Sequence, residues 1–559
     1  MAEPTPSIIE TRAAQAFPIL TAAEIKRLRR FGQAMTFADG EPLVRVGEIG
    51  HGLLIVLSGR VEISQHDDDR RNVIVTHEPG GFGGELAQLS GRPALVDAYA
   101  RGPTEVLAIA PERLRAVLTA EASLGERIMR ALILRRMGLL EVGAGGPVIV
   151  GHAHDSDVLR LEGFLTRNAH PHSRLDPDED ECARTLIERF HVTPEELPIV
   201  LCPGGEMLRN PTEAALGRCI GLVRPIDPDR VFDVAVVGAG PAGLATAVYA
   251  GSEGLSVLAL DCRAFGGQAG ASARIENYLG FPTGISGMAL MGRAFTQAQK
   301  FGVEMAIPSE AVQLEADDRN YRLRLGPGDT VRARTVVVAS GARYRRLDVS
   351  DLDAFEGASV HYWASPLEAK LCEGQEVALV GGGNSAGQGV VYLAEIAAHV
   401  TMLARRPLEE TMSAYLVQRI CGLDNVEVVT GVEVSALEGE QGMLEAIRWH
   451  ARGGGEERRR AVRELFLFIG AEPNTDWLRD CGLELDDKGF VRTGSSCTQG
   501  RLPLETSRPG VFAVGDVRSG SVKRVAASVG DGAQVVAAIH AYLARLRQEP
   551  VAAPVTETV

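Results

Sequence analysis

The strongest hydrophobic pattern in the chain is the uninterrupted apolar run Val234–Val237, which leads directly into a glycine-rich turn. A short run of this kind predicts a strand that is buried on both faces of a parallel sheet. The residues after the turn predict a helix and then a second buried strand, which ends at Asp261. Polar residues and glycines interrupt this stretch before about 20 apolar residues accumulate, so it does not predict a membrane-spanning helix.

The turn between the first strand and the helix has glycines at G-x-G-x-x-G spacing, namely Gly238, Gly240 and Gly243. The first glycine permits a tight bend, the second admits a pyrophosphate, and the third lets helix and strand pack closely. The N–H groups at the start of the helix then point at the phosphates. Asp261 lies at the spacing expected for a carboxylate that bonds a ribose. We therefore predict dinucleotide binding here, with Pro241 and Ala242 at the site.

A second apolar strand and glycine turn lie within Val377–Val400, where Gly381, Gly383 and Ala386 occupy the G-x-G-x-x-A places. The next strand leads not to an acid but to Arg405 and Arg406. Two guanidinium groups there suit a ribose 2′-phosphate, which a carboxylate would repel, although the alternative is ordinary solvated surface. The pattern predicts FAD at the first turn and NADPH at the second.

Short β-rich runs alternate with glycine turns near the N-terminus, at Leu53–Leu57, Arg60–Ser64, Val73–Thr76 and Val106–Ile109. Helical patterns flank these runs, at Ala22–Arg30 before them and at Pro111–Leu118 and Leu124–Leu140 after them. This arrangement predicts a small antiparallel sandwich or β-roll. Residues from about 146 to 226 predict a different unit, with the element order β-α-β-α-β-β-α.

Composition narrows the function classes. A length of 559 residues allows several domains, and the net charge of −15 makes nucleic acid an unfavourable partner. The first residues lack the basic flank and apolar core of a signal peptide. The 8 cysteines are scattered with no C-x-x-C spacing, so we expect neither a disulfide scaffold nor a metal site. We expect a cytoplasmic protein that neither spans nor binds a membrane.

Residues 231–545 resemble low-molecular-weight thioredoxin reductase along nearly their whole length. The motifs are specific in combination: GAGPAGLATAVYA, GGQA, RIENYLGFP, GGGNSAG, FIGAEPNT, GVFAVGDV and KRVAASVGDGAQV. The resemblance implies an FAD-binding domain of residues 231–344 and 465–545 and an inserted NADPH-binding domain of residues 345–464. It also implies a homodimer in which the NADPH domain rotates between two poses.

The resemblance further implies which residues contact the cofactors. Along the flavin and its ribityl chain it places Gly267, Gln268, Asn277, Gly515, Asp516, Val517, Arg524, Val525 and Ala526. At NADPH it places Gly383, Asn384, Ser385, Ala386, Arg405 and Arg406.

Two departures from that family bear on function. Its redox pair C-A-T-C has no cysteine here, because Trp363 and Pro366 occupy the two positions. A flavin-to-disulfide relay needs an attacking thiolate and a resolving partner, and neither is present at this place. The family's third NADPH arginine is Glu410, so a strict preference for NADPH over NADH is open.

Three functions are compatible with this pattern, and no catalytic residue can be named from the sequence. The first is an oxidoreductase that passes electrons from NADPH through FAD to an acceptor such as a redox protein, quinone or oxygen. The second is disulfide reduction with a non-standard cysteine, of which Cys372 is one candidate. The third is a flavin-based sensor without enzymatic activity.

Residues 1–145 resemble a cyclic nucleotide-binding domain through FADGEPLVRVGEIGHGLLIVLSGRVEI and FGGELAQLSGRPALVDA. In that family a Gly-Glu-Leu turn opens a helix over the cyclic phosphate, and the residues matching it are Gly84, Glu85 and Leu86. The family's phosphate-pairing arginine falls on Ala94, whereas Arg92 lies two residues early. Cyclic-nucleotide binding with a regulatory role is therefore one hypothesis, and a β-roll that packs without a nucleotide is the other.

Residues 146–226 resemble the thioredoxin/glutaredoxin fold, with Pro198 at the position of that family's cis-proline. The place of its C-x-x-C motif reads Gly151–Asp155 and contains no sulfur, so we expect no dithiol chemistry there. The predicted fold class is α/β, with two Rossmann-like domains preceded by a β-roll and a thioredoxin-like domain. Residues 546–559 are expected to form a flexible tail.

Overall fold

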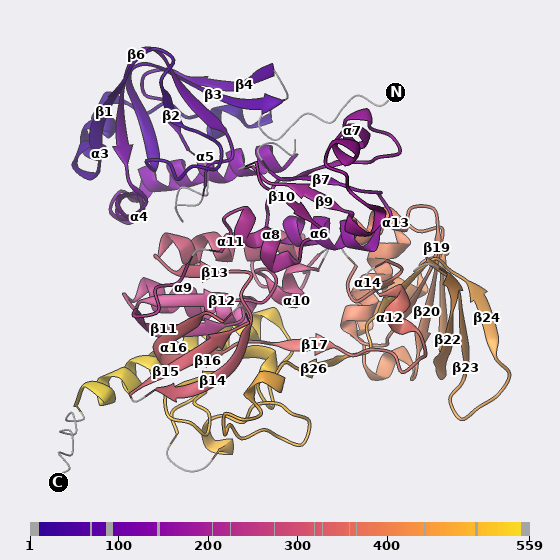
Figure 1. Cartoon of the computed structure of the whole chain (residues 1–559). Helices are drawn as coiled ribbons and strands as arrows, with labels where there is room; N and C mark the ends of the chain where they lie inside the picture. The colour runs from indigo at the N-terminus through magenta and orange to yellow at the C-terminus, as the bar shows by residue number, and fades with distance from the viewer. Residues whose placement is uncertain are drawn as a thin grey trace, which may run out of the picture. The chain divides into compact units, whose positions relative to one another are not determined.

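The computed structural model describes residues 11–67, 70–84, 93–141, 146–203, 205–223, 225–272, 274–317, 319–326, 328–356, 358–364, 366–440, 443–497 and 501–548. They form two compact units (Figure 1). The first comprises Met1–Arg224 with Gln299–Pro308, and the second comprises Pro225–Ala298 with Ser309–Val559. Within the described ranges, no helix is long and apolar enough to cross a membrane.

The first unit begins with a six-stranded sheet in the order β1-β6-β3-β4, in which β2 pairs with β6 and β5 with β3. Its strands are β1 (Gln33–Phe37), β2 (Pro42–Val44), β3 (Leu53–Asp67), β4 (Arg70–His77), β5 (Phe82–Gly83) and β6 (Asp97–Ile109). The flanking helices are α2 (Ala13–Ala16), α3 (Ala22–Leu28), α4 (Pro111–Ala120) and α5 (Ala122–Glu141). The predicted antiparallel roll with flanking helices is confirmed, and its apolar core lies between the sheet and α4 and α5.

Two runs that the sequence separates, Leu53–Leu57 and Arg60–Ser64, belong to the single strand β3. Gly59 lies between them with a φ of +76°, and the pairing of β3 with β6 shifts register on either side of it. A Cβ at Gly59 would lie 2.5 Å from the carbonyl oxygen of Pro103. The glycine therefore forms a bulge within one strand rather than a turn between two.

The rest of the first unit is a four-stranded sheet in the order β10-β9-β7-β8. Its elements are β7 (Val148–Val150), α6 (Ser156–Arg167), β8 (Ser173–Leu175), α7 (Glu181–Arg189), β9 (Ile199–Leu201), β10 (Met207–Arg209) and α8 (Glu213–Cys219). Strands β7 and β8 are parallel, whereas β9 runs antiparallel to β7 and β10. This is the predicted order of elements, and the peptide bond between Leu197 and Pro198 is cis.

The first sheet of the second unit contains the first glycine turn. The strands that the second unit contributes to this seven-stranded sheet are β11 (Val231–Val237), β12 (Val257–Leu260), β14 (Ala311–Asp317), β15 (Asn320–Leu325), β16 (Thr330–Val338) and β27 (Val511–Ala513). Strand β11 lies between β12 and β16, parallel to both, and β27 is parallel to β16. Helices α9 (Pro241–Ser252) and α16 (Val525–Gln548) approach closely at Gly532, where a Cβ would lie 2.7 Å from the carbonyl oxygen of Ala242.

The second sheet contains the other glycine turn and has the all-parallel order β18-β25-β19-β20-β21. Its strands are β18 (Val360–His361), β19 (Glu376–Val380), β20 (His399–Ala404), β21 (Val426–Thr430) and β25 (Glu464–Leu467). Helices α14 (Asn384–Ala394) and α15 (Ala414–Cys421) pack on its core. A meander of β22 (Val432–Glu440), β23 (Met443–Ala451) and β24 (Arg458–Ala461) completes this part.

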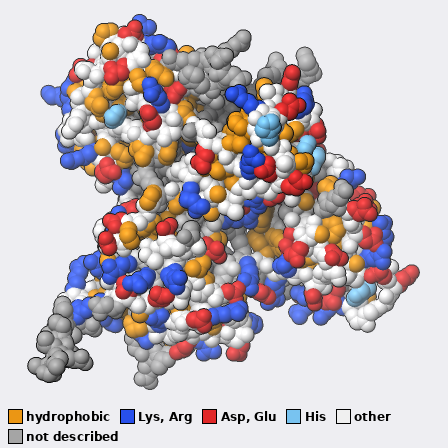
Figure 2. All heavy atoms as spheres, in the orientation of Figure 1, with side chains coloured by type: hydrophobic (Ala, Val, Ile, Leu, Met, Phe, Trp, Pro, Cys, Tyr) orange, Lys and Arg blue, Asp and Glu red, His pale blue; other side chains and the backbone are white. Residues whose placement is uncertain are grey.

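The two Rossmann-like sheets are connected by a short antiparallel pair, β17 (Ala342–Tyr344) and β26 (Ala471–Pro473). Since β25 pairs with β18 and β19, the second sheet extends beyond the predicted domain boundary at residue 464. Acidic and basic side chains are interspersed over the visible face (Figure 2). That face is not the continuous basic surface that nucleic-acid binding requires.

Candidate functional site

A cavity of about 640 Å³ in the second unit brings residues from both glycine turns together. The predicted site residues that line it are Gly240, Pro241, Ala242, Asp261, Gly267, Gln268, Asn277, Asn384, Ser385, Asp516, Arg524 and Val525. The predicted residues outside its lining are Gly238, Gly243, Gly383, Ala386, Arg405, Arg406, Gly515, Val517 and Ala526. Turns from two separate sheets thus open onto one space.

The first glycine turn has almost no room for side chains at two of its three positions. A Cβ at Gly238, whose φ is +112°, would lie 2.2 Å from the carbonyl oxygen of Ala339. A Cβ at Gly243 would lie 1.8 Å from the carbonyl oxygen of Gly238. At Gly240 the nearest atom would be the Cα of Gly267, at 3.8 Å, so the backbone here is open to a ligand. This is the division of roles that a dinucleotide-binding turn requires.

Asp261 follows β12 and stabilises the first glycine turn through hydrogen bonds. Its Oδ2 accepts a hydrogen bond from the Ala239 N–H at 2.8 Å, and its Oδ1 accepts one from the Arg263 N–H at 3.1 Å. Burial raises the pKa of this carboxyl, and the backbone hydrogen bonds act in the opposite direction. Asp261 also lines the cavity, so it reaches both the turn and the space where a ribose would lie.

Asp516 is a buried acceptor that has no donor in the described structure. It lies in a short 3-10 helix, η7 (Gly515–Val517), and its Oδ1 has no hydrogen-bond partner. Burial raises the pKa of its carboxyl, and the nearby Lys523 ammonium opposes that rise. Since buried polar atoms are normally satisfied, this oxygen fits a ligand that brings a hydroxyl donor, as a ribityl chain does.

Asp531 supports this helix, although the sequence did not identify it as a functional residue. Its Oδ2 accepts a hydrogen bond from the Gly515 N–H at 3.0 Å and lies 3.2 Å from Arg518 Nη2. The sequence feature that could have identified Asp531 is its place in the motif KRVAASVGDGAQV, but only the fold brings it to Gly515.

Elsewhere at the cavity, Gln268 Nε2 donates to the carbonyl oxygen of Ala342 at 2.5 Å.

The second glycine turn resembles the first at its first two positions and differs at the third. A Cβ at Gly381 would lie 2.5 Å from the carbonyl oxygen of Phe468, so the first position again excludes a side chain. At Gly383, the N-cap residue of α14, a Cβ would meet nothing within 4 Å. Asn384 lines the cavity and its Oδ1 accepts a hydrogen bond from the Ser413 N–H at 2.7 Å. The third position holds Ala386, which is 1% exposed.

Arg405 and Arg406 follow β20, and both side chains are exposed outside the cavity lining. Arg406 Nη1 lies 3.9 Å from Glu410 Oε2, so the residue at the place of the expected third arginine opposes its charge. The pair lies at the correct strand end for a 2′-phosphate, but it is not buried in a preformed pocket.

An aromatic side chain, that of Trp363, occupies the first position of the missing redox pair. Trp363 and Tyr344 both line the cavity, with ring centroids 6.3 Å apart. Trp363 Nε1 donates to Glu368 Oε1 at 2.7 Å, which fixes the indole. Cys372 is fully buried and its Sγ donates to the carbonyl oxygen of Glu368 at 3.3 Å. Burial raises the pKa of the Cys372 thiol to about 12, so at neutral pH it is not a nucleophile.

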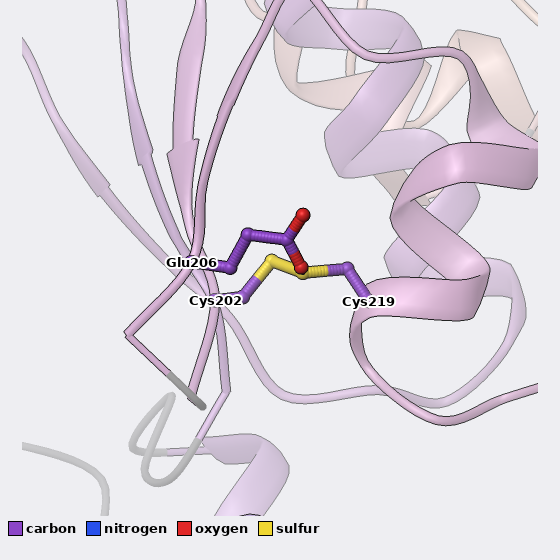
Figure 3. The surroundings of a disulfide bond; sticks show 3 residues. All are labelled: Cys202, Glu206 and Cys219. Carbon is purple, nitrogen blue, oxygen red and sulfur yellow. A yellow bond between two sulfur atoms is a disulfide. The ribbon is translucent and has the colours of Figure 1, made fainter.

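The sequence predicts no disulfide scaffold, but the structure contains one disulfide, between Cys202 and Cys219 in the thioredoxin-like part (Figure 3). Cys202 follows β9 and Cys219 ends α8, with Cα atoms 6.3 Å apart. Glu206 Oε2 lies 3.4 Å from the Cys219 sulfur. The pair is 17 residues apart in sequence, and no local spacing rule for redox motifs predicts it.

Of the residues predicted to contact a cyclic nucleotide, Gly84 follows β5 with a φ of +122°. Glu85, Leu86 and Arg92 lie outside the described residues. In the thioredoxin-like part, His152 Nδ1 lies 3.2 Å from Asp178 Oδ2, on an exposed surface. An exposed group of this kind does not by itself define a metal site.

Two Rossmann-like sheets whose glycine turns share one cavity define a flavin- and pyridine-nucleotide-dependent class of oxidoreductase. Comparison with known proteins agrees with this class. Residues 232–532 match the family model for pyridine nucleotide-disulphide oxidoreductase, and the chain belongs to that family. Residues 34–121 match the model for a cyclic nucleotide-binding domain.

Several relatives resemble the second unit. Thioredoxin reductase of Mycolicibacterium smegmatis is 33% identical over 304 residues, which cover 54% of this chain and 93% of the relative. NADH dehydrogenase of Bacillus subtilis is 31% identical over 56% of this chain, which spans 59% of that relative. The crystal structure of T. acidophilum thioredoxin reductase has a TM-score of 0.52 and 29% identity, covering 57% of this chain and 100% of that structure.

Proposed function

We propose that the chain oxidises NADPH and passes the electrons through FAD to an acceptor other than a flavin-adjacent dithiol. One observation carries this proposal: the cavity of about 640 Å³ is lined by both glycine turns and, at the position of the redox cysteines, by Trp363. FAD, when bound, would supply a carrier that takes hydride from a nicotinamide. The cavity residues orient the two nucleotides and exclude water from the space between them.

For FAD, the described residues divide the binding task. Gly240 leaves its backbone open to the pyrophosphate at the start of α9, and Asp261 reaches the adenosine ribose. Asp516 accepts from the ribityl chain with its unpaired Oδ1. Gln268 and Arg524 lie along the flavin side of the cavity.

For NADPH, Asn384 and Ser385 at the start of α14 approach the pyrophosphate. Arg405 and Arg406 pair with the 2′-phosphate from the end of β20. Glu410 opposes Arg406, so we propose that discrimination against NADH is weaker than two arginines alone would give. A homodimer and a rotation of the NADPH-binding part between two poses belong to the same proposal.

The test is an anaerobic titration of purified protein with NADPH, followed by a panel of quinone, iron–sulfur and disulfide acceptors. We expect loss of the yellow flavin absorption and sustained turnover with at least one acceptor that is not a disulfide. Turnover confined to disulfides would reject this choice of acceptor. Flavin that is reduced without turnover on any acceptor would favour the sensor hypothesis instead.

A second candidate function, disulfide reduction, is favoured by the Cys202–Cys219 pair rather than by Cys372. Persistent disulfides are uncommon in a reducing cytoplasm, where those present are usually catalytic or redox-sensing. Two electrons from the pyridine nucleotide and two protons would break the S–S bond and leave two thiols. Glu206, 3.4 Å from Cys219, is placed to exchange one of those protons.

Mass-spectrometric thiol counting before and after anaerobic NADPH tests this candidate. If the disulfide is an acceptor, alkylation detects about two additional thiols per chain. The increase should disappear in the Cys202→Ser/Cys219→Ser double variant and persist in Cys182→Ser, a matched control at an exposed free cysteine. An unchanged count in a protein whose flavin is reduced would remove this pair from the electron path.

The N-terminal β-roll suggests regulation, which remains a hypothesis based on its presence in the same chain. A ligand can alter NADPH oxidation only if it binds two states of the protein with different affinity. Cyclic AMP and cyclic GMP that neither bind nor change turnover would reject the cyclic-nucleotide form of this hypothesis.

A further inference from the structure

The β-roll encloses a second cavity, of about 80 Å³, between its sheet and α5. Its described lining is mostly aliphatic and includes Val44, Leu54, Val61, Ile63, Leu95 and Leu139. The ionisable side chains in that lining are His51, His77 and Arg135. A ligand in this space would therefore contact apolar wall over most of its surface.

Arg135 places a guanidinium group at the wall of this cavity although it is only 7% exposed. Its Nε donates to the carbonyl oxygen of Ala16 at 2.9 Å, and its Nη1 donates to those of Phe82 at 2.8 Å and Gly84 at 3.0 Å. The rings of Phe17 and Phe82 lie 5.1 Å and 4.6 Å from its Cζ. Its Nη2 is buried without a hydrogen-bond partner, and no described carboxylate pairs with it.

A buried cation without a counter-charge is costly to the fold. Burial lowers the pKa of Arg135 to about 9, so the guanidinium is still protonated at neutral pH. His77, on β4, does not add charge, because burial and the neighbouring guanidinium lower its pKa to about 3. The cavity thus combines aliphatic walls with one buried positive charge that carbonyl oxygens orient and no described anion neutralises.

We propose that this cavity binds a small organic anion, with a carboxylate against Arg135 and an apolar body against the aliphatic walls. A charge-assisted hydrogen bond from Nη2 would satisfy the buried donor and neutralise the guanidinium at once. The described walls offer few polar side chains to bond a sugar and a base, and Ala94, where the phosphate-pairing arginine is expected, is buried. This site does not depend on the proposed NADPH oxidation.

The test measures binding to the full-length protein by calorimetry, with hexanoate and benzoate as probes. Their uncharged amides, hexanamide and benzamide, have nearly the same shape and should bind at least about 10-fold more weakly, because a charge-assisted hydrogen bond contributes about 1.5–3 kcal/mol. Arg135→Leu should weaken carboxylate binding by a similar factor, and Arg135→Lys by less. Arg130→Leu is the control, since Arg130 lies on the same helix but is exposed and pairs with Glu126.

Cyclic AMP and cyclic GMP form the second arm of the test. If either binds more tightly than both carboxylates, the cavity is a nucleotide site and the proposal is overturned. Equal binding of acid and amide, or no binding of any probe, overturns it as well. If Arg135→Leu fails to fold, the acid–amide comparison on the unaltered protein still decides. Since no NADPH is used, failure here is distinguishable from failure of the proposed oxidoreductase activity.

Discussion

The two glycine turns of the second unit are both proposed to bind a dinucleotide, but they differ in the residues that would do so. At the first turn, Gly243 packs its Cα against the Gly238 carbonyl, and Asp261 is bonded to backbone N–H groups. At the second, the side chains proposed to select the nucleotide are Arg405 and Arg406, which are exposed on the surface. The proposed flavin site is thus part of the folded core, whereas the proposed nicotinamide selectivity depends on exposed side chains that make few contacts with the fold. Substitutions at the first turn should lower the stability of the fold and the flavin content, whereas substitutions at the second should lower the preference for NADPH over NADH.

The largest effect is expected from Gly243→Ala. The new Cβ would lie 1.8 Å from the Gly238 carbonyl oxygen, so the turn has to move away from α9. Overpacking of this kind typically costs about 1–3 kcal/mol, and the displaced turn should no longer retain flavin. Flavin content after purification and the thermal unfolding midpoint measure the effect.

Gly292→Ala is the matched control for this substitution. Gly292 lies in α11 (Gly287–Lys300), and a Cβ there would meet nothing within 4 Å. The change should stabilise the helix by up to about 1 kcal/mol and leave flavin content unaltered. If both variants retain flavin equally, the first turn is not the tight site described above.

Asp516→Leu should have the next largest effect, because it removes the buried acceptor proposed for the ribityl chain. Hydrogen bonds to a charged group contribute about 1.5–3 kcal/mol, so flavin affinity should fall by about 10- to 100-fold. Reconstitution of the flavin-free protein with FAD measures this affinity. Unchanged affinity would place the ribityl chain elsewhere.

The buried carboxyl of Asp516 should also make the stability of the flavin-free protein depend on pH. Its folded pKa is raised by burial, so the unfolded chain loses this proton at lower pH than the folded chain. Stability therefore falls as pH rises from the ordinary carboxyl pKa through the raised one. Asp516→Asn should remove that decline and match the unaltered protein below the ordinary carboxyl pKa, as read from urea unfolding across pH.

At the second turn, the Arg405→Gln/Arg406→Gln double variant should raise the KM for NADPH by about 10-fold or more and leave that for NADH nearly unchanged. Flavin content and the thermal midpoint should not move, in contrast to Gly243→Ala. Loss of flavin in this variant would contradict the separation between core and surface roles.

The smallest effect is expected from Glu410→Gln. This removes an exposed carboxylate 3.9 Å from Arg406 and should improve the preference for NADPH by no more than about fivefold, since exposed ion pairs contribute about 0–1 kcal/mol. The ratio of kcat/KM for NADPH to that for NADH measures the change. A shift toward NADH would show that Glu410 does not oppose the phosphate.

Most of this fold could be predicted from the sequence because short local patterns determine its strands, helices and glycine turns. The run Val234–Val237 before G-x-G-x-x-G predicted a buried strand followed by a tight glycine turn, and both are observed. Features that depend on contacts between residues far apart in the sequence could not be predicted in this way. Gly59 forms a bulge in β3 because Pro103 lies opposite, which no local pattern encodes. The Cys202–Cys219 disulfide likewise depends on how β9 meets α8.

The candidate sites were likewise predictable only where a local motif marks their residues. Motifs located the cavity-lining glycines and Asp516, but Asp531 and Arg135 act through tertiary neighbours that are distant in sequence. Arg135 in particular occurs in a helical pattern with other arginines, and nothing in that pattern distinguishes the buried one. Its role becomes visible only where α5 covers the β-roll cavity.

The most direct test of the central claim is the stoichiometry of anaerobic flavin reduction by NADPH. If electrons from NADPH reach a flavin that has no adjacent dithiol, about one equivalent should bleach the flavin completely. A requirement for about two equivalents would show that a disulfide shares the electrons. Flavin that NADPH and NADH both fail to reduce would contradict the account, because the two glycine turns would then not serve one reaction.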